Sequence, residues 1–163
     1  MGSTVVAAAG VRALATARAQ LGVREHPPGS NRTCFGAWFG ENGVPWCAIF
    51  VSYCFATGAG VVLGRGSRGA WARGVSSVPL LGDWLCDAGL WLGPEAKPRP
   101  GDLVLFDWDG GAPDHVGLVE RVPGAGWIGT IEGNTAVGDD CDGGAVMRRR
   151  RRLSAVAGFG RLP

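Results

Sequence analysis

The strongest constraint on the fold is a change in hydrophobic pattern at residues 97–101, KPRPG. Before this segment, apolar residues recur at spacings of three and four, which is typical of amphipathic helices. After it, short apolar runs alternate with turns rich in glycine, proline and aspartate, which is typical of strands. Helices followed by an antiparallel sheet predict an α+β domain.

Three helices are predicted before this change of pattern. The first covers about residues 6–21 and ends before a proline-rich segment, because proline excludes helical backbone there. The second begins near Pro45, since proline lacks the N–H that would be unpaired in a first helical turn. The third covers residues 77–88, with Ser77 as its N-cap.

Five strands are predicted after it, and we expect the helices to pack on a five- to six-stranded antiparallel sheet. The predicted strands cover residues 102–106, 115–122, 127–134, 145–150 and 156–162. The 163 residues contain no repeat and no linker, and 46% are hydrophobic. The sequence therefore predicts one domain over residues 1–163.

Composition and charge restrict the partners of the chain. Only 18% of the residues are charged and the net charge is +2, which argues against a nucleic-acid partner. No stretch approaches the ~20 apolar residues of a membrane span. The N-terminus lacks the basic and apolar regions of a secretory signal, so we expect synthesis in the cytoplasm of the producing cell.

The chain has an odd number of cysteines, with no C-x-x-C pair: Cys34, Cys47, Cys54, Cys86 and Cys141. Cys47 lies at the predicted start of a helix, where the helix dipole favours thiolate over thiol. Cys54 follows two helical turns later in an apolar run, and we expect it in the core. The other three are interpreted as structural or incidental, with a Cys34–Cys86 bridge left open.

A thiolate nucleophile needs a proton shuttle, and the chain has two histidines. His26 lies in a proline-rich loop and is predicted to be a solvated surface residue. His115 opens a predicted strand, which is a firmer platform for a base. A two-residue turn at residues 123–124 would place His115 opposite Glu132, with Asn134 further along the same face.

These residue types are the parts of a papain-like hydrolase. Cys47 is the candidate nucleophile and His115 the candidate base. Glu132 is predicted to hold the second ring nitrogen and so to fix the imidazole tautomer. Asn134 is predicted to orient the ring, hold substrate or donate to an oxyanion.

Three segments resemble the CHAP domain, the cysteine- and histidine-dependent amidohydrolase/peptidase family: PPGSNRTCFGAWFGENGVPWCAIFVSYCF, PRPGDLVLFDWDGGAPDHVGLVE and TIEGN. The resemblance covers about residues 10–162. It implies a papain-like fold with Cys47 as nucleophile, His115 as base, Glu132 as third member and Asn134 as an accessory polar group.

The resemblance also implies a function. Members of this family cut amide bonds in peptidoglycan, between glycan and stem peptide or within the peptides, and many are catalytic domains of bacteriophage endolysins. We therefore expect a cofactor-free monomer that acts on the bacterial cell wall, with or without a separate wall-binding module. The alternatives are a catalytically silent wall-binding or virion structural module, and a thiol hydrolase that acts on an amide outside the wall.

Two acidic loops are candidates for metal sites. Residues 107–111, DWDGG, would need an acidic ligand where Leu118 stands if they formed an EF-hand-like loop. The region before the nucleophile contains Glu41 as its only carboxylate. We therefore expect no bound metal, a glycine-rich turn at residues 107–111 and a solvated loop at residues 138–144.

Five consecutive arginines, residues 148–152, admit two interpretations. They suit anionic wall polymers such as teichoic acids. They also suit a solvated strand edge that discourages aggregation. The tryptophans at positions 38, 46, 108 and 127 are candidates for the walls of a cleft, although core packing is the default expectation for each.

Overall fold

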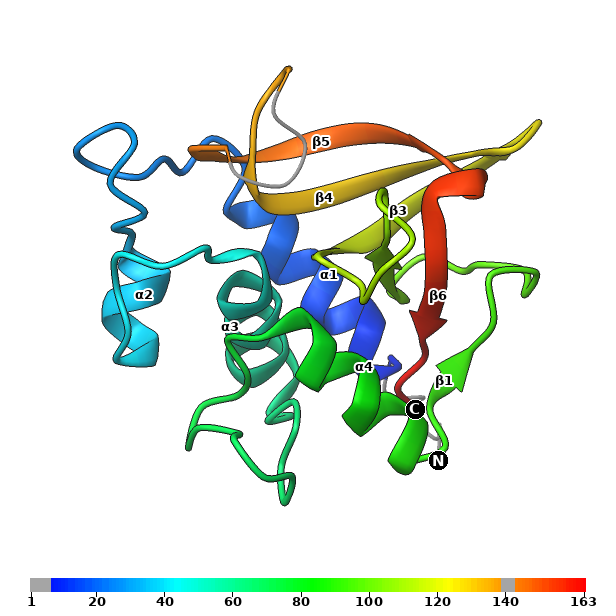
Figure 1. The fold of residues 1–163 in the computed structure, drawn as a ribbon, viewed down its shortest axis with the longest axis horizontal. Coiled ribbons are helices and arrows are strands. Elements are labelled where there is room, and N and C mark those ends of the chain that lie inside the picture. The colour runs from blue at the N-terminus through cyan, green and yellow to red at the C-terminus, as the bar shows by residue number, and fades with distance from the viewer. Residues whose placement is uncertain (1–6, 139–142) are drawn as a thin grey trace, which may run out of the picture.

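The computed structural model describes residues 7–138 and 143–163, which form four α-helices and one six-stranded antiparallel sheet (Figure 1). The helices are α1 (Ala9–Ala19), α2 (Cys34–Phe39), α3 (Cys47–Ala59) and α4 (Val78–Asp87). The strands are β1 (Trp91–Leu92), β2 (Leu103–Phe106), β3 (His115–Gly124), β4 (Trp127–Thr135), β5 (Ala145–Arg152) and β6 (Val156–Gly160). The α+β class is confirmed. None of the helices in the described ranges is long and apolar enough to cross a membrane.

The three predicted helices are present as α1, α3 and α4. The hydroxyl of Ser77 accepts the N–H of Leu80, which confirms its role as the N-cap of α4. The short helix α2 was not predicted. It begins after Thr33, whose hydroxyl accepts the N–H of Gly36 at 3.0 Å, and it ends at Gly40 with a φ of 102°. Its six residues are too few for hydrophobic periodicity to register.

The strands lie in the order β1-β6-β2-β3-β4-β5, and every neighbouring pair is antiparallel. The five predicted strands are confirmed. The additional strand β1 has two residues and pairs with β6 at one edge of the sheet. The arginine-rich strand β5 forms the other edge, and β2 and β3 lie in the middle.

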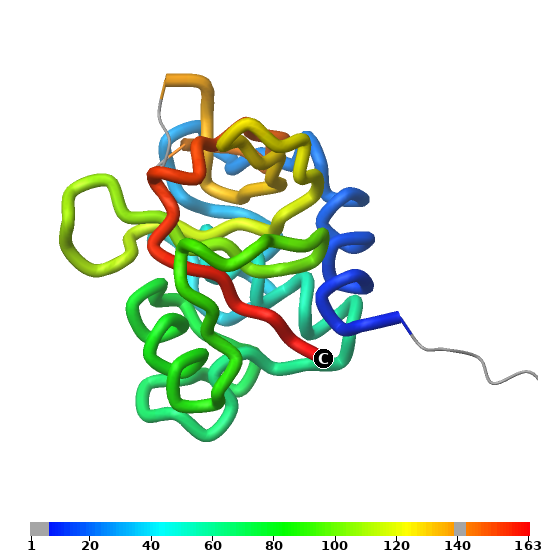
Figure 2. Tube along the Cα trace, turned by 90° about the vertical axis from the view of Figure 1, so that its right-hand side faces the viewer, coloured from blue at the N-terminus to red at the C-terminus, as the bar shows by residue number. Residues whose placement is uncertain are grey.

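The central strand β2 is buried on both faces. Leu103 and Leu105 belong to the main core with the helices, whereas Val104 and Phe106 pack in a second cluster on the opposite face. Helix α3 is the centre of the main core: it packs on α1, β3 and β4, and Figure 1 shows it between α2 and the strands. Figure 2 shows α1 running alongside the strands.

The β3–β4 hairpin departs from the predicted register. Its two-residue turn is at Ala125–Gly126, both with positive φ, and the ladder pairs Leu118 with Ile131. A tight hairpin turn needs positive φ, which the ring of Pro123 forbids, so the predicted turn at residues 123–124 was wrong. At Leu118 the observed pairing is displaced by two residues from the predicted pairing. Because an even displacement keeps every side chain on its face, His115 and Glu132 still share a face, as diagonal neighbours.

The beginning of α1 is hydrogen-bonded to the residues that follow β6 at the end of the described chain. The N–H of Ala9 donates to the carbonyl of Pro163 at 3.0 Å. The next residue, Gly10, touches the backbone of Gly101, since a Cβ atom at position 10 would lie 2.3 Å from the Gly101 carbonyl oxygen. These contacts attach the start of α1 to the segment before β2 and to the segment after β6.

Candidate active site

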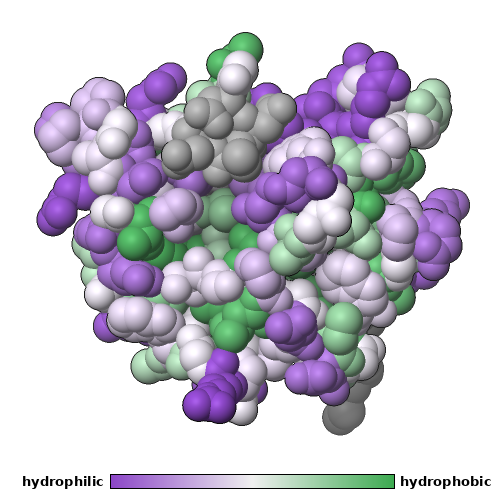
Figure 3. Space-filling model, viewed as in Figure 1, coloured by the Kyte–Doolittle hydropathy of each residue, from purple (hydrophilic) through white to green (hydrophobic). Residues whose placement is uncertain are grey.

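Cys47 is the first residue of α3, and its side chain is buried at the end of the helix that meets β4. The contact depends on Gly133. A Cβ atom at that position would lie 2.7 Å from Cβ of Phe50 and 2.8 Å from a ring carbon of Trp46. Only glycine lets the first turn of α3 approach β4 this closely. Near this helix start, Figure 3 shows a hydrophobic hollow in the surface.

His115 is the first residue of β3 and is fully buried. Its Nε2 atom lies 2.9 Å from Oε2 of Glu132. The other ring nitrogen, Nδ1, is buried and makes no hydrogen bond within the part of the chain that the structure describes. Burial alone lowers the pKa of His115, but the interactions with Cys47 and Glu132 outweigh burial and raise the pKa to about 9. The imidazole is therefore protonated at neutral pH.

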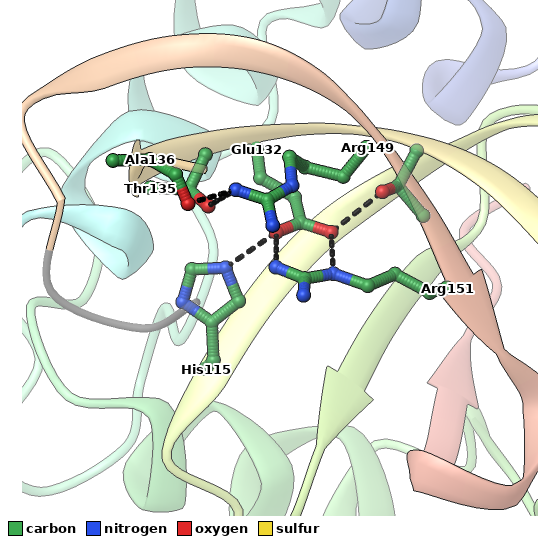
Figure 4. Close-up of polar contacts among 7 residues, drawn as sticks. His115, Glu132, Thr135, Ala136, Arg149 and Arg151 are labelled. Carbon is green, nitrogen blue, oxygen red and sulfur yellow. Dashed lines mark hydrogen bonds and ion pairs between the residues drawn. The ribbon is translucent and has the colours of Figure 1, made fainter. Parts of the chain in front are cut away.

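Glu132 is also fully buried, and its carboxylate accepts hydrogen bonds from three side chains (Figure 4). Besides His115, the Thr130 hydroxyl donates to Oε1 at 2.5 Å. The Arg151 guanidinium donates through Nε to Oε1 at 2.9 Å and through Nη2 to Oε2 at 2.5 Å. Burial raises the pKa of Glu132. The interactions with Arg151 and with His115 lower it by more than burial raises it, so that the net pKa is about 2. Glu132 is therefore ionised at neutral pH and fixes the His115 ring.

Arg151 is a site residue that the sequence did not reveal. Its side chain is buried, and its guanidinium lies over the rings of Phe106 and Trp108, 5.5 and 5.2 Å from their centroids. Arg149, two residues earlier on β5, also turns toward β4 and donates to the Thr135 hydroxyl at 3.0 Å (Figure 4). The interpretation of residues 148–152 as a solvated edge was therefore wrong for Arg151. Alternation along a strand predicts that every second arginine of residues 148–152 points toward the sheet, but it does not tell which of them do.

Asn134 lies two residues after Glu132 in β4 and is buried. Its φ of 57° interrupts the regular ladder with β5, and its carbonyl accepts the N–H of Gly143 at 2.8 Å. The side-chain role assigned to Asn134 stays a prediction.

The other cysteines are placed as follows. Cys34 and Cys86 are exposed free thiols, so the bridge left open between them is not formed. Cys54 is buried in α3, as predicted, and burial raises the pKa of its thiol. Cys141 lies outside the described residues. His26 is exposed, as predicted for a surface residue.

The loop after β2 is a turn closed by its own aspartate. Oδ1 of Asp107 accepts the main-chain N–H groups of Asp109 at 3.1 Å, Gly110 at 2.8 Å and Gly111 at 3.2 Å. This confirms the predicted glycine-rich turn. Within residues 7–138 and 143–163, no three or more His, Cys, Asp or Glu side chains are grouped so that they could hold a metal ion. Part of the predicted loop at residues 138–144 lies outside the described residues.

Comparison with known proteins identifies the family and the fold. The model of the CHAP domain family matches residues 39–134, which is more than half of the chain. No curated protein sequence matches. Two crystal structures of Ly7917, one of them titled as a complex with the hydrolyzing product of MDP, resemble the fold with a TM-score of 0.55 and 21% sequence identity. Each comparison covers 94% of this chain and 62% of the Ly7917 chain. The match includes all four predicted site residues, and the chain belongs to the CHAP domain family.

Proposed function

We propose that this chain is a peptidoglycan hydrolase that cuts amide bonds by a cysteine mechanism. The observation that carries the proposal is the buried row formed by Cys47, His115 and Glu132 at the junction of α3 with the β3–β4 hairpin. Membership of the CHAP family supports it, as does the likeness to Ly7917, whose structure is titled with the hydrolyzing product of MDP.

In the first half-reaction, the Cys47 thiolate attacks the amide carbonyl and forms an S–C bond. The protonated His115 gives its proton to the nitrogen of the leaving amine as the C–N bond breaks. An acyl-enzyme thioester and a free amine result. Glu132 keeps its negative charge throughout and stabilises the imidazolium from the opposite ring nitrogen.

In the second half-reaction, neutral His115 takes a proton from water while the water oxygen attacks the thioester carbonyl. The S–C bond breaks, the product leaves as a carboxylic acid that gives the second proton of the water to solvent, and the thiolate and imidazolium are restored. Because all three side chains come from one chain, we propose that the enzyme works as a monomer.

The start of α3 supplies the groups that stabilise the oxyanion. The first N–H groups of a helix have no partner within the helix. At α3 the N-cap is Trp46, whose side chain makes no capping hydrogen bond. The N–H groups around Cys47 therefore remain available to the negative oxygen of the tetrahedral intermediate.

The test is the digestion of purified cell walls, followed by turbidity and by mass spectrometry of the soluble fragments. Wild-type protein should clear the suspension, and Cys47→Ala should not. A new free amine on the first alanine of the stem peptide identifies an N-acetylmuramoyl-L-alanine amidase, whereas a cut within the stem or cross-bridge identifies an endopeptidase. Binding to walls without any released fragment would instead show a silent wall-binding module.

A further inference from the structure

A groove of about 470 Å³ lies beside the catalytic histidine, where β4 and β5 meet the loop after β2. Its main lining residues are Asp107, Trp108, Trp127, Arg150, Arg151 and Arg152. Figure 3 shows hydrophilic side chains gathered over this end of β4 and β5, at the upper right of the view. The proposed mechanism assigns no role to the groove.

Two of its arginines surround one indole ring. The guanidinium carbons of Arg150 and Arg152 lie 4.1 and 4.5 Å from the centroid of the Trp127 ring. Both side chains are exposed, and no ion pair joins either of them to a carboxylate of the described residues. Their neighbours differ in this respect, because Arg148 pairs with Glu120 and Arg151 with Glu132. Two uncompensated cations held against the same ring favour the binding of an anion between them.

The groove has little negative charge of its own. The charge of Arg151 is compensated by Glu132, and Asp107 is the one carboxylate among the described residues that line the groove. Oδ1 of Asp107 already accepts three main-chain N–H groups of its own turn. The groove therefore keeps a net positive charge.

Trp108 connects the groove to the active site. This side chain is 40% exposed, and its ring centroid lies 5.8 Å from that of His115. The part of the groove that Trp108 lines therefore lies close to the His115 ring.

We propose that this groove is a substrate subsite that binds an oxyanion of the wall polymer next to the scissile amide. The proposal rests on the proposed function. Planar guanidinium groups bind carboxylate and phosphate oxygens through paired hydrogen bonds, and the wall offers both, as free carboxylates of the stem peptides and as phosphates of teichoic acids.

The experiment measures binding of the inactive Cys47→Ala protein to purified walls by depletion from the supernatant. The test variant adds Arg150→Gln and Arg152→Gln. The matched control adds Arg65→Gln and Arg68→Gln instead, which removes two exposed charges from the loop between α3 and α4. Each protein is applied to intact walls, to walls with amidated carboxylates and to walls stripped of phosphate polymers.

We expect the test variant to bind intact walls at least tenfold more weakly than the control. If amidation removes this difference, the ligand is a carboxylate; if phosphate removal does so, it is a phosphate. Equal binding of the two variants to intact walls would overturn the subsite. The proposed function is judged separately, by the fragments that the active wild-type protein releases.

Discussion

Gly117 of β3 lies against the side chain of Glu132, so that a Cβ atom at position 117 would stand 2.6 Å from Cγ of Glu132. It would also stand 3.1 Å from the carbonyl oxygen of Ile131. Glu132 cannot move aside freely, because His115, Thr130 and Arg151 all hold its carboxylate. The absence of a side chain at position 117 is therefore a condition for the geometry of the site.

The first prediction is that Gly117→Ala lowers kcat for wall hydrolysis by about 10- to 100-fold, because misplacement of a catalytic group by an ångström costs about that much. Overpacking should also lower the free energy of unfolding by about 1–3 kcal/mol. The control is Gly82→Ala in α4, where the added Cβ atom meets only Leu105 at 3.6 Å. The control should leave kcat unchanged and raise the stability by about 0.5–1 kcal/mol. A folded Gly117→Ala protein with wild-type kcat would show that Glu132 has more freedom than the contacts indicate.

The second prediction is that Arg151 acts as a positioning residue. Arg151→Gln removes the largest influence that lowers the pKa of Glu132, so the acidic limb of the pH–rate profile should move to higher pH. Arg151→Lys keeps the charge and should restore the limb partly, although it loses the paired hydrogen bonds. A residue that only stabilises the fold would leave the limb in place.

The matched control for Arg151 is Arg148→Gln on the same strand. Arg148 is exposed and pairs with Glu120, which keeps Arg18 as a second partner. Such a surface pair contributes about 0–1 kcal/mol. The pH–rate profile of this control should match that of the wild type.

The third prediction concerns stability against pH. The pKa of His115 is raised from 6.5 to about 9, so its contribution is fully present below pH 6.5 and is lost as the pH rises through 9. The pKa of Glu132 is lowered from 4.5 to about 2, so its contribution is present above pH 4.5 and is lost as the pH falls toward 2. Urea unfolding at a series of pH values should show a decline between pH 6.5 and 9 that is absent in His115→Gln. The same alkaline decline in both proteins would assign it to another group.

The fourth prediction separates the cysteines. Iodoacetamide at pH 6 should modify Cys47 before Cys34 and Cys86, because of these three cysteines Cys47 alone interacts with the His115 imidazole, the base that would activate a nucleophile. Cys54 should stay unmodified in the folded protein, since it is buried and its pKa is raised. Peptide mapping gives the order of modification, and the loss of lytic activity should follow the Cys47 adduct alone. Activity that survives complete modification of Cys47 would exclude it as the nucleophile.

The sequence was sufficient for the main elements because their signals are local. The N-cap at Ser77, the apolar run of α3 and the alternating residues of β3 and β4 each act within a few positions. The residue pair His115–Glu132 was found because strand alternation preserves faces even when the register is displaced by two.

What the sequence could not show depends on contacts between distant segments. Arg151 looks like any other member of its run until β5 is placed beside β4, where it meets Glu132. The exposed ring of Trp108 lies beside His115 because β2 pairs with β3, and core packing was the wrong expectation for it. Trp46, by contrast, is buried as expected.

The hydrogen bond between Ala9 and Pro163 has a consequence for protein engineering. A short linker that joins these two positions would close the backbone into a ring without displacing α1 or β6. New termini could then be opened in the exposed loop around residues 65–69, far along the chain from α3's first turn and from the β3–β4 hairpin. Such a circular permutant would have its ends in this loop, away from the original junction, and His115 and Glu132 would precede Cys47 in the new chain order. Fusion partners could then be attached at the loop without touching the residues of the catalytic site.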